Sequence, residues 1–202
     1  MSSQSTEIGV LDFFSFIGMP RRLHLDMADL EQRYRALSRQ YHPDYFYNAL
    51  PAERRASLER SSYLNDAYRT LKNPIARVEY LLGLEGFAPK TAEESARQVP
   101  PALLEEVFAL NERLDEVRQL KSSGAPSEKW KPRLESARTP IEERRAEHER
   151  QLQELSSRWD GLVDADAAGA EKRAVLEALR ERVLERNYIS NLLAGIERER
   201  DS

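Results

Sequence analysis

The sequence predicts an all-α protein built from two helical units. Its 202 residues include only eight glycines, while Leu, Ala, Glu and Arg, which favour helices, are abundant. Hydrophobic residues recur at three- and four-residue spacing in both halves of the chain. A stretch without this periodicity, ending in a Pro-Pro pair, separates the two halves. We therefore expect a small helical domain at 1–86, a linker at 87–100 and a three-helix bundle at 101–202.

Charge and composition exclude several classes of protein. The chain has 31 basic and 35 acidic residues, a formal net charge of −4. Up to Gly86 there are 11 of each sign, so neither half has the basic excess of a nucleic-acid-binding protein. No apolar run approaches the roughly 20 residues that cross a bilayer, and no signal-peptide pattern is found. With no cysteine, disulfides and cysteine-based metal sites are excluded. We expect a cytoplasmic protein that binds neither nucleic acid nor membrane.

The first domain begins with two predicted helices. Residues 10–17 form a short apolar helix ended by Gly18. Asp26 is a typical N-cap for a second helix. The second helix must end at Tyr41, because Pro43 disfavours helical angles at the residue before it.

This second helix has an apolar and a basic face. At about 100° per residue, Arg35 and Arg39 lie opposite the apolar stripe, and Arg33 lies on its flank. Such arginines usually form a solvated helix face, and only the motif that follows favours a binding surface. The stripe itself is predicted to be buried and comprises Leu30, Tyr34, Leu37 and Tyr41.

Two further helices complete the first domain. After a loop at 42–50, Pro51 suits the first turn of a third helix. Asn73 caps a short fourth helix that Gly83 and Gly86 end. The predicted buried side of the third helix repeats at i, i+4 and i+7, with Leu64, Tyr68 and Leu71. The second and third helices should pack as an antiparallel hairpin.

The second half is predicted to form three long helices, at about 101–121, 128–160 and 170–199. Pro132 and Pro140 weaken the first turns of the middle helix and leave its start open. Its later turns have the 4-3-4-3 spacing of an antiparallel bundle, with His148, Leu152, Leu155, Trp159 and Leu162 toward the core.

The triplet His42-Pro43-Asp44 is the strongest functional signal. Taken alone, it could be a turn with a solvated histidine. It lies, however, where a basic-faced helix ends and before another long helix. In this context roughly the first 85 residues resemble the J domain of DnaJ-type co-chaperones, although Tyr45 stands where many J domains have a lysine. The matching residues are Leu30, Tyr34, Leu37, Tyr41 to Asp44, Leu64 to Tyr68, and Leu71.

This resemblance implies roles for the triplet. A J domain docks on an Hsp70-type ATPase chaperone and stimulates ATP hydrolysis there. His42 would be a hydrogen-bonding contact, Pro43 would stiffen the loop, and Asp44 would accept from a cation of the partner. The basic face would meet an acidic surface of the ATPase and steer association. It consists of Arg33, Arg35 and Arg39.

The rest of the chain narrows the resemblance. It lacks the Gly/Phe-rich and cysteine-rich zinc regions of a general DnaJ. The fourth helix, with the residues Ala76 to Leu82, and the acidic bundle after it resemble the HscB-type co-chaperones of iron–sulfur cluster assembly, from Leu11 to Ile196. That resemblance implies delivery of an IscU-like cluster scaffold protein to an HscA- or DnaK-like chaperone, promoting cluster maturation and transfer. The positions that match the family's scaffold contacts are Leu104, Phe108, Glu112 and Tyr188, whereas Glu105 and Ala109 depart from it.

The helical pattern points to the same face independently. Leu104 and Phe108 lie beside the core stripe of their helix, among several glutamates. An apolar patch rimmed by acids suits a partner that is apolar at its centre and basic at its edge. Packing against the third helix would account for Leu104 equally well. In the last helix, Tyr188 falls opposite the predicted core residues Val175, Leu179, Val183 and Leu193.

Other classes of function fit less well. His24, His42 and His148 lie in different elements, and there is no metal-ligand spacing, phosphate loop or nucleophile elbow. We therefore predict neither enzymatic activity nor a cofactor. A J-domain co-chaperone for a different client in general protein folding remains the alternative. A coiled-coil adaptor would leave the first half unexplained.

Overall fold

The computed structural model describes residues 11–87 and 101–201, without the side chains of residues 101–104. It is all-α over these ranges, with a helical hairpin and short flanking helices followed by three long helices, as predicted. No helix in them is long and apolar enough to cross a membrane. The predicted linker at 87–100 lies, except for Phe87, outside the described residues.

The described residues fall into two compact units. Unit 1 contains the residues up to 87 together with Ser156–Glu177, and unit 2 contains the remainder of the second half. The sequence pattern places residues 156–177 in the bundle instead. The division of the chain into a first domain at 1–86, a linker at 87–100 and a bundle at 101–202 stays a prediction.

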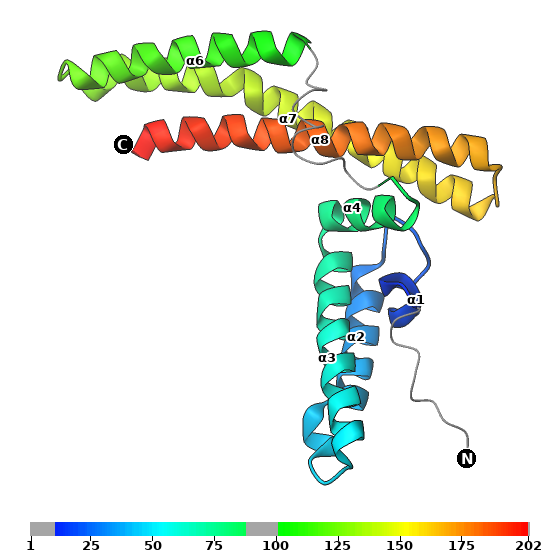
Figure 1. The fold of residues 1–202 in the computed structure, drawn as a ribbon. Coiled ribbons are helices and arrows are strands. Elements are labelled where there is room, and N and C mark those ends of the chain that lie inside the picture. Colours follow the sequence, from blue (N-terminus) through cyan, green and yellow to red (C-terminus); the bar gives the residue numbers. More distant parts are fainter. Residues whose placement is uncertain (1–10, 88–100, 202) are drawn as a thin grey trace. The chain divides into compact units, whose positions relative to one another are not determined.

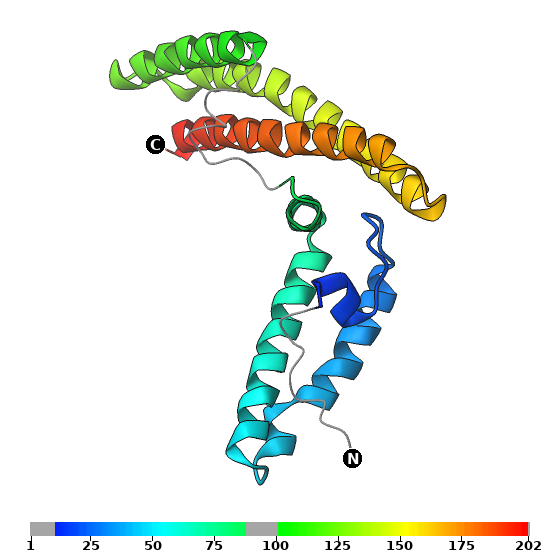
Figure 2. The same cartoon turned by 45° about the vertical axis from the view of Figure 1, so that its right-hand side comes forward.

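Unit 1 is organised around a helical hairpin. Its elements are α1 (Phe13–Ile17), α2 (Met27–Tyr41), a 3₁₀ turn η1 (Pro43–Phe46), α3 (Pro51–Lys72) and α4 (Pro74–Leu84). Helices α2 and α3 run side by side, joined through η1 at the tip of the hairpin, with α1 against them (Figures 1 and 2).

The core of unit 1 lies between these helices. Leu30 is 1% exposed, and the other residues of the predicted stripe of α2 are half-buried and pack on the same core. The core stripe of α2 is thus confirmed. The buried residues of this core are Phe14, Ile17, Met19, Leu30, Leu64, Ala67 and Leu71.

The helix ends follow the predicted caps closely. Asp26 accepts hydrogen bonds from the backbone of Ala28 (2.8 Å) and Asp29 (3.2 Å), and Asn73 does the same at the start of α4. Gly18 ends α1 in the left-handed region, at φ 78°. Helix α4 continues through Gly83 to Leu84, so Gly83 does not end it as predicted.

Unit 2 is built from α6 (Pro101–Ser122), α7 (Ser127–Asp164) and α8 (Gly169–Asp201), the last two shared with unit 1. Leu114 and Val117 of α6 pack with Ile141 of α7 and Ile189 of α8. In α8, Val175, Leu179 and Val183 are buried as predicted, whereas Leu193 is half-buried.

Helix α7 runs unbroken through both of its prolines. A proline at position 140 removes the N–H that would bond to the carbonyl of Ser136. In the structure, the Arg113 side chain of α6 donates to that carbonyl instead (3.4 Å). A side chain from a neighbouring helix therefore compensates in part for the missing hydrogen bond.

Candidate functional sites at the hairpin tip and on the bundle

The His42-Pro43-Asp44 loop is anchored to α3 through the residue that precedes it. Helix α2 ends at Tyr41, and the Ser57 hydroxyl of α3 donates to the Tyr41 carbonyl (2.9 Å). Ser57 is only 2% exposed. This bond satisfies a carbonyl at the helix end that would otherwise lack a partner. Ser57 could not be predicted from the sequence, because a lone serine in a helix has no recognisable pattern.

His42 caps the 3₁₀ turn that follows. Its Nδ1 accepts the backbone N–H of Asp44 (3.3 Å). In the neutral ring the proton must then sit on Nε2. The side chains of His42 and Asp44 are 50% and 87% exposed. The loop thus presents a donor and a carboxylate acceptor to solvent at neighbouring positions.

The loop is also held by its own backbone. Pro43 occupies the first turn of η1, where its fixed φ suits the geometry. The N–H of Tyr45 donates to the His42 carbonyl (3.1 Å), and that of Ala49 donates to the Phe46 carbonyl (3.0 Å). These bonds fix the path of the loop before α3 begins.

The three predicted arginines of α2 are exposed but differ in their contacts. Arg33 pairs with Asp29 (2.8 Å) and donates to the Gly18 carbonyl at the end of α1 (2.7 Å). Arg35 pairs with Glu31 one turn earlier. Arg39 makes no ion pair within the described part of the chain. Arg33 therefore also supports the fold. Of the three arginines, Arg39 is the one whose charge has no ion-pair partner among the described residues.

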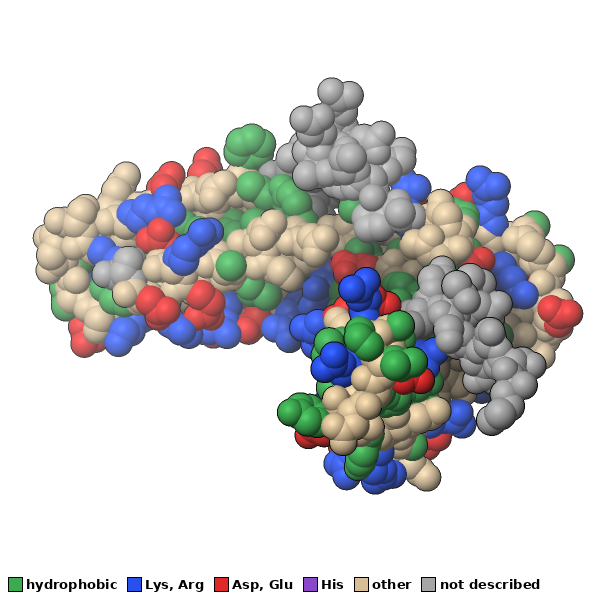
Figure 3. Space-filling view, turned by 60° about the horizontal axis from the view of Figure 1, so that its bottom comes forward, with side chains coloured by type: hydrophobic (Ala, Val, Ile, Leu, Met, Phe, Trp, Pro, Cys, Tyr) green, Lys and Arg blue, Asp and Glu red, His purple; other side chains and the backbone are tan. Residues whose placement is uncertain are grey.

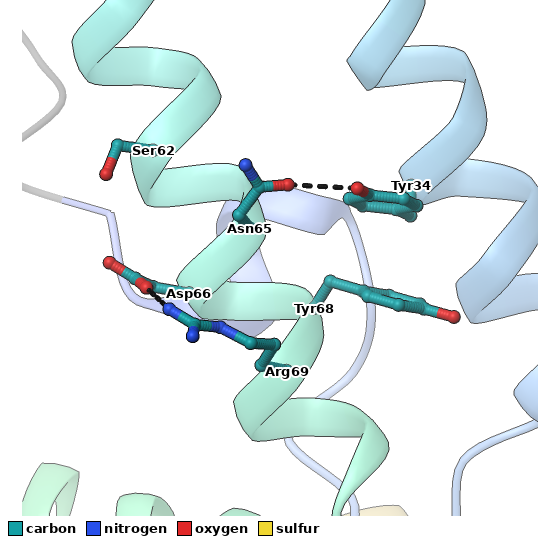
Figure 4. Close-up of a pocket in the computed structure, with 6 residues that line it drawn as sticks. All are labelled: Tyr34, Ser62, Asn65, Asp66, Tyr68 and Arg69. Atoms are coloured by element: carbon teal, nitrogen blue, oxygen red, sulfur yellow. Dashed lines mark hydrogen bonds and ion pairs between the residues drawn. The ribbon is translucent and has the colours of Figure 1, made fainter.

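A depression on the α2–α3 hairpin holds the Asn65-Asp66 region of the J-domain match (Figure 4). The Tyr34 hydroxyl donates to the Asn65 side chain (2.9 Å), and the Tyr34 and Tyr68 rings stack at 4.1 Å. Arg69 pairs with Asp66 on the same helix. The two contacts of Tyr34 therefore fasten α2 to α3. Its lining residues are Tyr34, Ser62, Asn65, Asp66, Tyr68 and Arg69.

The predicted scaffold-binding face is partly exposed. Phe108 is 70% exposed on α6, with Glu105 and Glu112 also exposed, whereas Tyr188 on α8 is half-buried. The side chain of Leu104 lies outside the described ones. Most of the Phe108 side chain is thus exposed to solvent and not packed within the bundle. It is the clearest contact candidate on this face.

The other two histidines have structural partners. His148 is 2% exposed, and its Nε2 lies 2.7 Å from the Arg182 carbonyl, so its predicted place in the core is confirmed. The ring of His24 pairs with Asp160 (3.0 Å). In the described ranges, no three His, Asp or Glu side chains are grouped so as to hold a metal ion.

Comparison with known proteins identifies structural neighbours. No family model matches the sequence. Among solved structures, chaperone HscB from Vibrio cholerae matches with a TM-score of 0.66 at 24% identity, over 94% of this chain and 98% of that one. Human co-chaperone protein HscB matches with a TM-score of 0.63 at 26% identity, over 95% of this chain and 83% of that one. The HscB resemblance predicted from the sequence is confirmed by these neighbours.

Proposed function

From this shared HscB architecture we propose that the protein is a J-domain co-chaperone of iron–sulfur cluster assembly. It brings the cluster scaffold protein to an Hsp70-type chaperone in the cytoplasm and stimulates the chaperone's ATPase. Cluster maturation and transfer follow from the partner's ATP cycle. The protein itself is not an enzyme, and its action consists of docking and orientation.

The observation that carries the proposal is the presentation of the triplet. His42 offers Nε2–H and Asp44 offers a carboxylate from a loop that Ser57 and the backbone hold in place. A preorganised loop loses little conformational entropy on docking, so more of its contact energy remains for coupling. Arg39, without an ion pair in the described ranges, adds a cation that can steer an acidic partner surface.

The scaffold assignment rests on α6. Phe108 projects from the bundle beside two exposed carboxylates, Glu105 and Glu112. An exposed aromatic ring among acids suits a partner with an apolar centre and a basic edge. Both HscB neighbours span nearly the whole chain, bundle included, which favours this client over one in general protein folding.

Single-turnover ATP hydrolysis by an Hsp70-type partner tests the proposal. The full chain and a candidate scaffold are added separately and together, and the assay is repeated with His42→Gln. We expect stimulation by the chain, more with scaffold present, and loss of both with His42→Gln. Stimulation that the scaffold does not increase would contradict the proposed client. No stimulation by folded protein would contradict the J-domain function.

A further inference from the structure

Exposed apolar side chains gather at the tip of the α2–α3 hairpin. In the described ranges, seven large hydrophobic residues are exposed, and four of them lie within residues 45–58. Tyr45 is 74% exposed, Tyr47 78%, Leu50 69% and Leu58 57%. We call these four residues the apolar tip. Singly exposed apolar residues are common, whereas a group of four close together in the chain is a candidate interaction surface.

Local structure holds these side chains outward. Tyr45 lies in η1, and Tyr47 follows it with its N–H on the Asp44 carbonyl (3.4 Å). The ring of Tyr45 meets the ring of His42 edge-on at 6.1 Å. Leu50 caps α3, while Phe46 is half-buried. The apolar tip therefore borders the triplet directly and shares its backbone support.

The tip is bordered by cations. Arg54 and Arg55 precede Leu58 by four and three residues, so they share its face of α3. Both are exposed, and neither makes an ion pair among the described residues. Arg39, at the end of α2, is likewise exposed and without an ion pair among the described residues. The nearby Glu53 carboxylate is engaged, because it accepts the Leu50 N–H (3.0 Å). Figure 3, with the hairpin end brought forward, shows hydrophobic and basic side chains together there.

We propose that the apolar tip is a second docking surface for the Hsp70-type ATPase, beside the triplet. Its occupant is an apolar patch of that chaperone rimmed by carboxylates, which the arginines at 39, 54 and 55 complement. The proposal rests on the proposed function and adds a partner surface to it. The tip supplies affinity by burying apolar area, whereas His42 and Asp44 couple docking to hydrolysis.

The test uses the full chain with Tyr47→Ser and Leu58→Ser combined. Both side chains are exposed, so the unfolding temperature should stay that of the unchanged protein. ATP hydrolysis is measured against co-chaperone concentration, without scaffold. We expect the concentration for half-maximal stimulation to rise about tenfold or more, with maximal stimulation retained, because two apolar contacts are lost. The increase should persist at high salt, since apolar burial is not screened.

A matched control separates the tip from exposed apolar surface in general. Leu11→Ser removes another exposed apolar side chain (47%), outside the tip and the proposed binding sites, and should leave the half-maximal concentration unchanged. If the doubly substituted chain matches the unchanged one, the tip is not a docking surface. A lower maximum at unchanged half-maximal concentration would also overturn the proposal, because the tip would then act through the triplet.

Failure of the proposed function and self-association through the tip would each give a distinct result. No stimulation by the unchanged chain would refute the proposed function itself, before any variant is compared. If the unchanged chain sediments as a dimer and the doubly substituted chain as a monomer, with equal stimulation, the tip covers a second copy of this chain. That result would exclude the ATPase as its occupant.

Discussion

Arg77 and Asp160 both bind the backbone of Leu23, Arg77 at its carbonyl and Asp160 at its N–H. The Arg77 guanidinium donates to the Leu23 carbonyl, and the Asp160 carboxylate accepts the Leu23 N–H (2.6 Å). Arg77 is 3% exposed, and burial lowers its pKa while the charge of Asp160 opposes that shift. A buried cation is costly unless hydrogen-bonded and near an opposite charge. Both conditions are met here within unit 1.

Replacing Asp160 should destabilise unit 1. Asp160→Asn removes the negative charge near Arg77 and weakens the acceptors for Leu23 and for the His24 N–H (2.8 Å). We expect a loss of about 2 kcal/mol in the free energy of unfolding. Urea unfolding of the full chain measures it. Asp164→Asn is the control, because its ion pair with Arg22 is half-exposed and should contribute under about 1 kcal/mol.

A fragment of residues 1–86 should be less stable than the same residues in the full chain. It lacks Asp160 and also Trp159, whose indole N–H donates to the Arg21 carbonyl (3.0 Å). Hydrogen exchange at the Leu23 and His24 amides should be at least about tenfold faster in the fragment, corresponding to about 1.4 kcal/mol. Equal exchange rates would mean that the contacts from 156–177 add nothing to the J domain's stability.

Gly18→Ala should lower the free energy of unfolding more than the same substitution at another glycine with a positive φ. At φ 78° a side chain is disfavoured, and a Cβ there would lie 2.9 Å from the Arg33 guanidinium. Gly86 has a similar φ of 76° with open space around it. Gly86→Ala should therefore cost about 1 kcal/mol, and Gly18→Ala more, because moving the Arg33 guanidinium also weakens its hydrogen bond to the Gly18 carbonyl. Thermal unfolding of both variants gives the difference directly.

Asp12 should make part of the stability depend on acid pH. Burial opposes its ionisation, but hydrogen bonds from Ser15 and the Arg21 ion pair prevail and lower the pKa of Asp12 below 3.8. Stability from such a group is present above the unfolded-state pKa and lost as pH falls through the folded-state pKa. Unfolding measured from about pH 5 to below 3.8 should show a flatter profile for Asp12→Asn. An unchanged profile would rule out this contribution.

Phe108 should be replaceable without loss of the fold. Its side chain is 70% exposed, so Phe108→Ala should change the free energy of unfolding by under about 0.5 kcal/mol. Leu110→Ala, two residues on and 4% exposed, should cost about 2–5 kcal/mol. Scaffold binding, measured by titration calorimetry with the full chain, should weaken for Phe108→Ala. Unfolding by Phe108→Ala would show that the ring is a packing residue.

Local features of the fold could be predicted from sequence because each has a near-neighbour cause. Asp26 and Asn73 cap helices through backbone groups two or three residues away, and Pro43 ends α2 by its own ring. The fully buried Leu30 follows from helical spacing. The triplet could be found in the same way, since its residues are contiguous.

Contacts between distant segments could not be predicted in this way. Asp160 accepts from main-chain amides at 23 and 24, and main-chain groups leave no pattern in a sequence. The same holds for Ser57 on the Tyr41 carbonyl and Arg33 on the Gly18 carbonyl. The continuity of α7 through Pro140 likewise depends on Arg113 from another helix. The exposed triplet could thus be predicted from the sequence, whereas the contacts from distant segments to main-chain groups could not.

The backbone recognition of the α1–α2 loop has a consequence for domain exchange. Trp159 and Asp160 bind main-chain atoms of residues 21, 23 and 24, so the side chains there can vary without losing these bonds. A foreign J domain grafted in front of residues 156–177 must reproduce the path of that loop and carry an arginine where Arg77 stands. Chimeras matched only in their His-Pro-Asp loops would leave Asp160 desolvated beside amides it cannot reach. Compatibility of a grafted domain with residues 156–177 therefore depends on loop geometry more than on sequence identity.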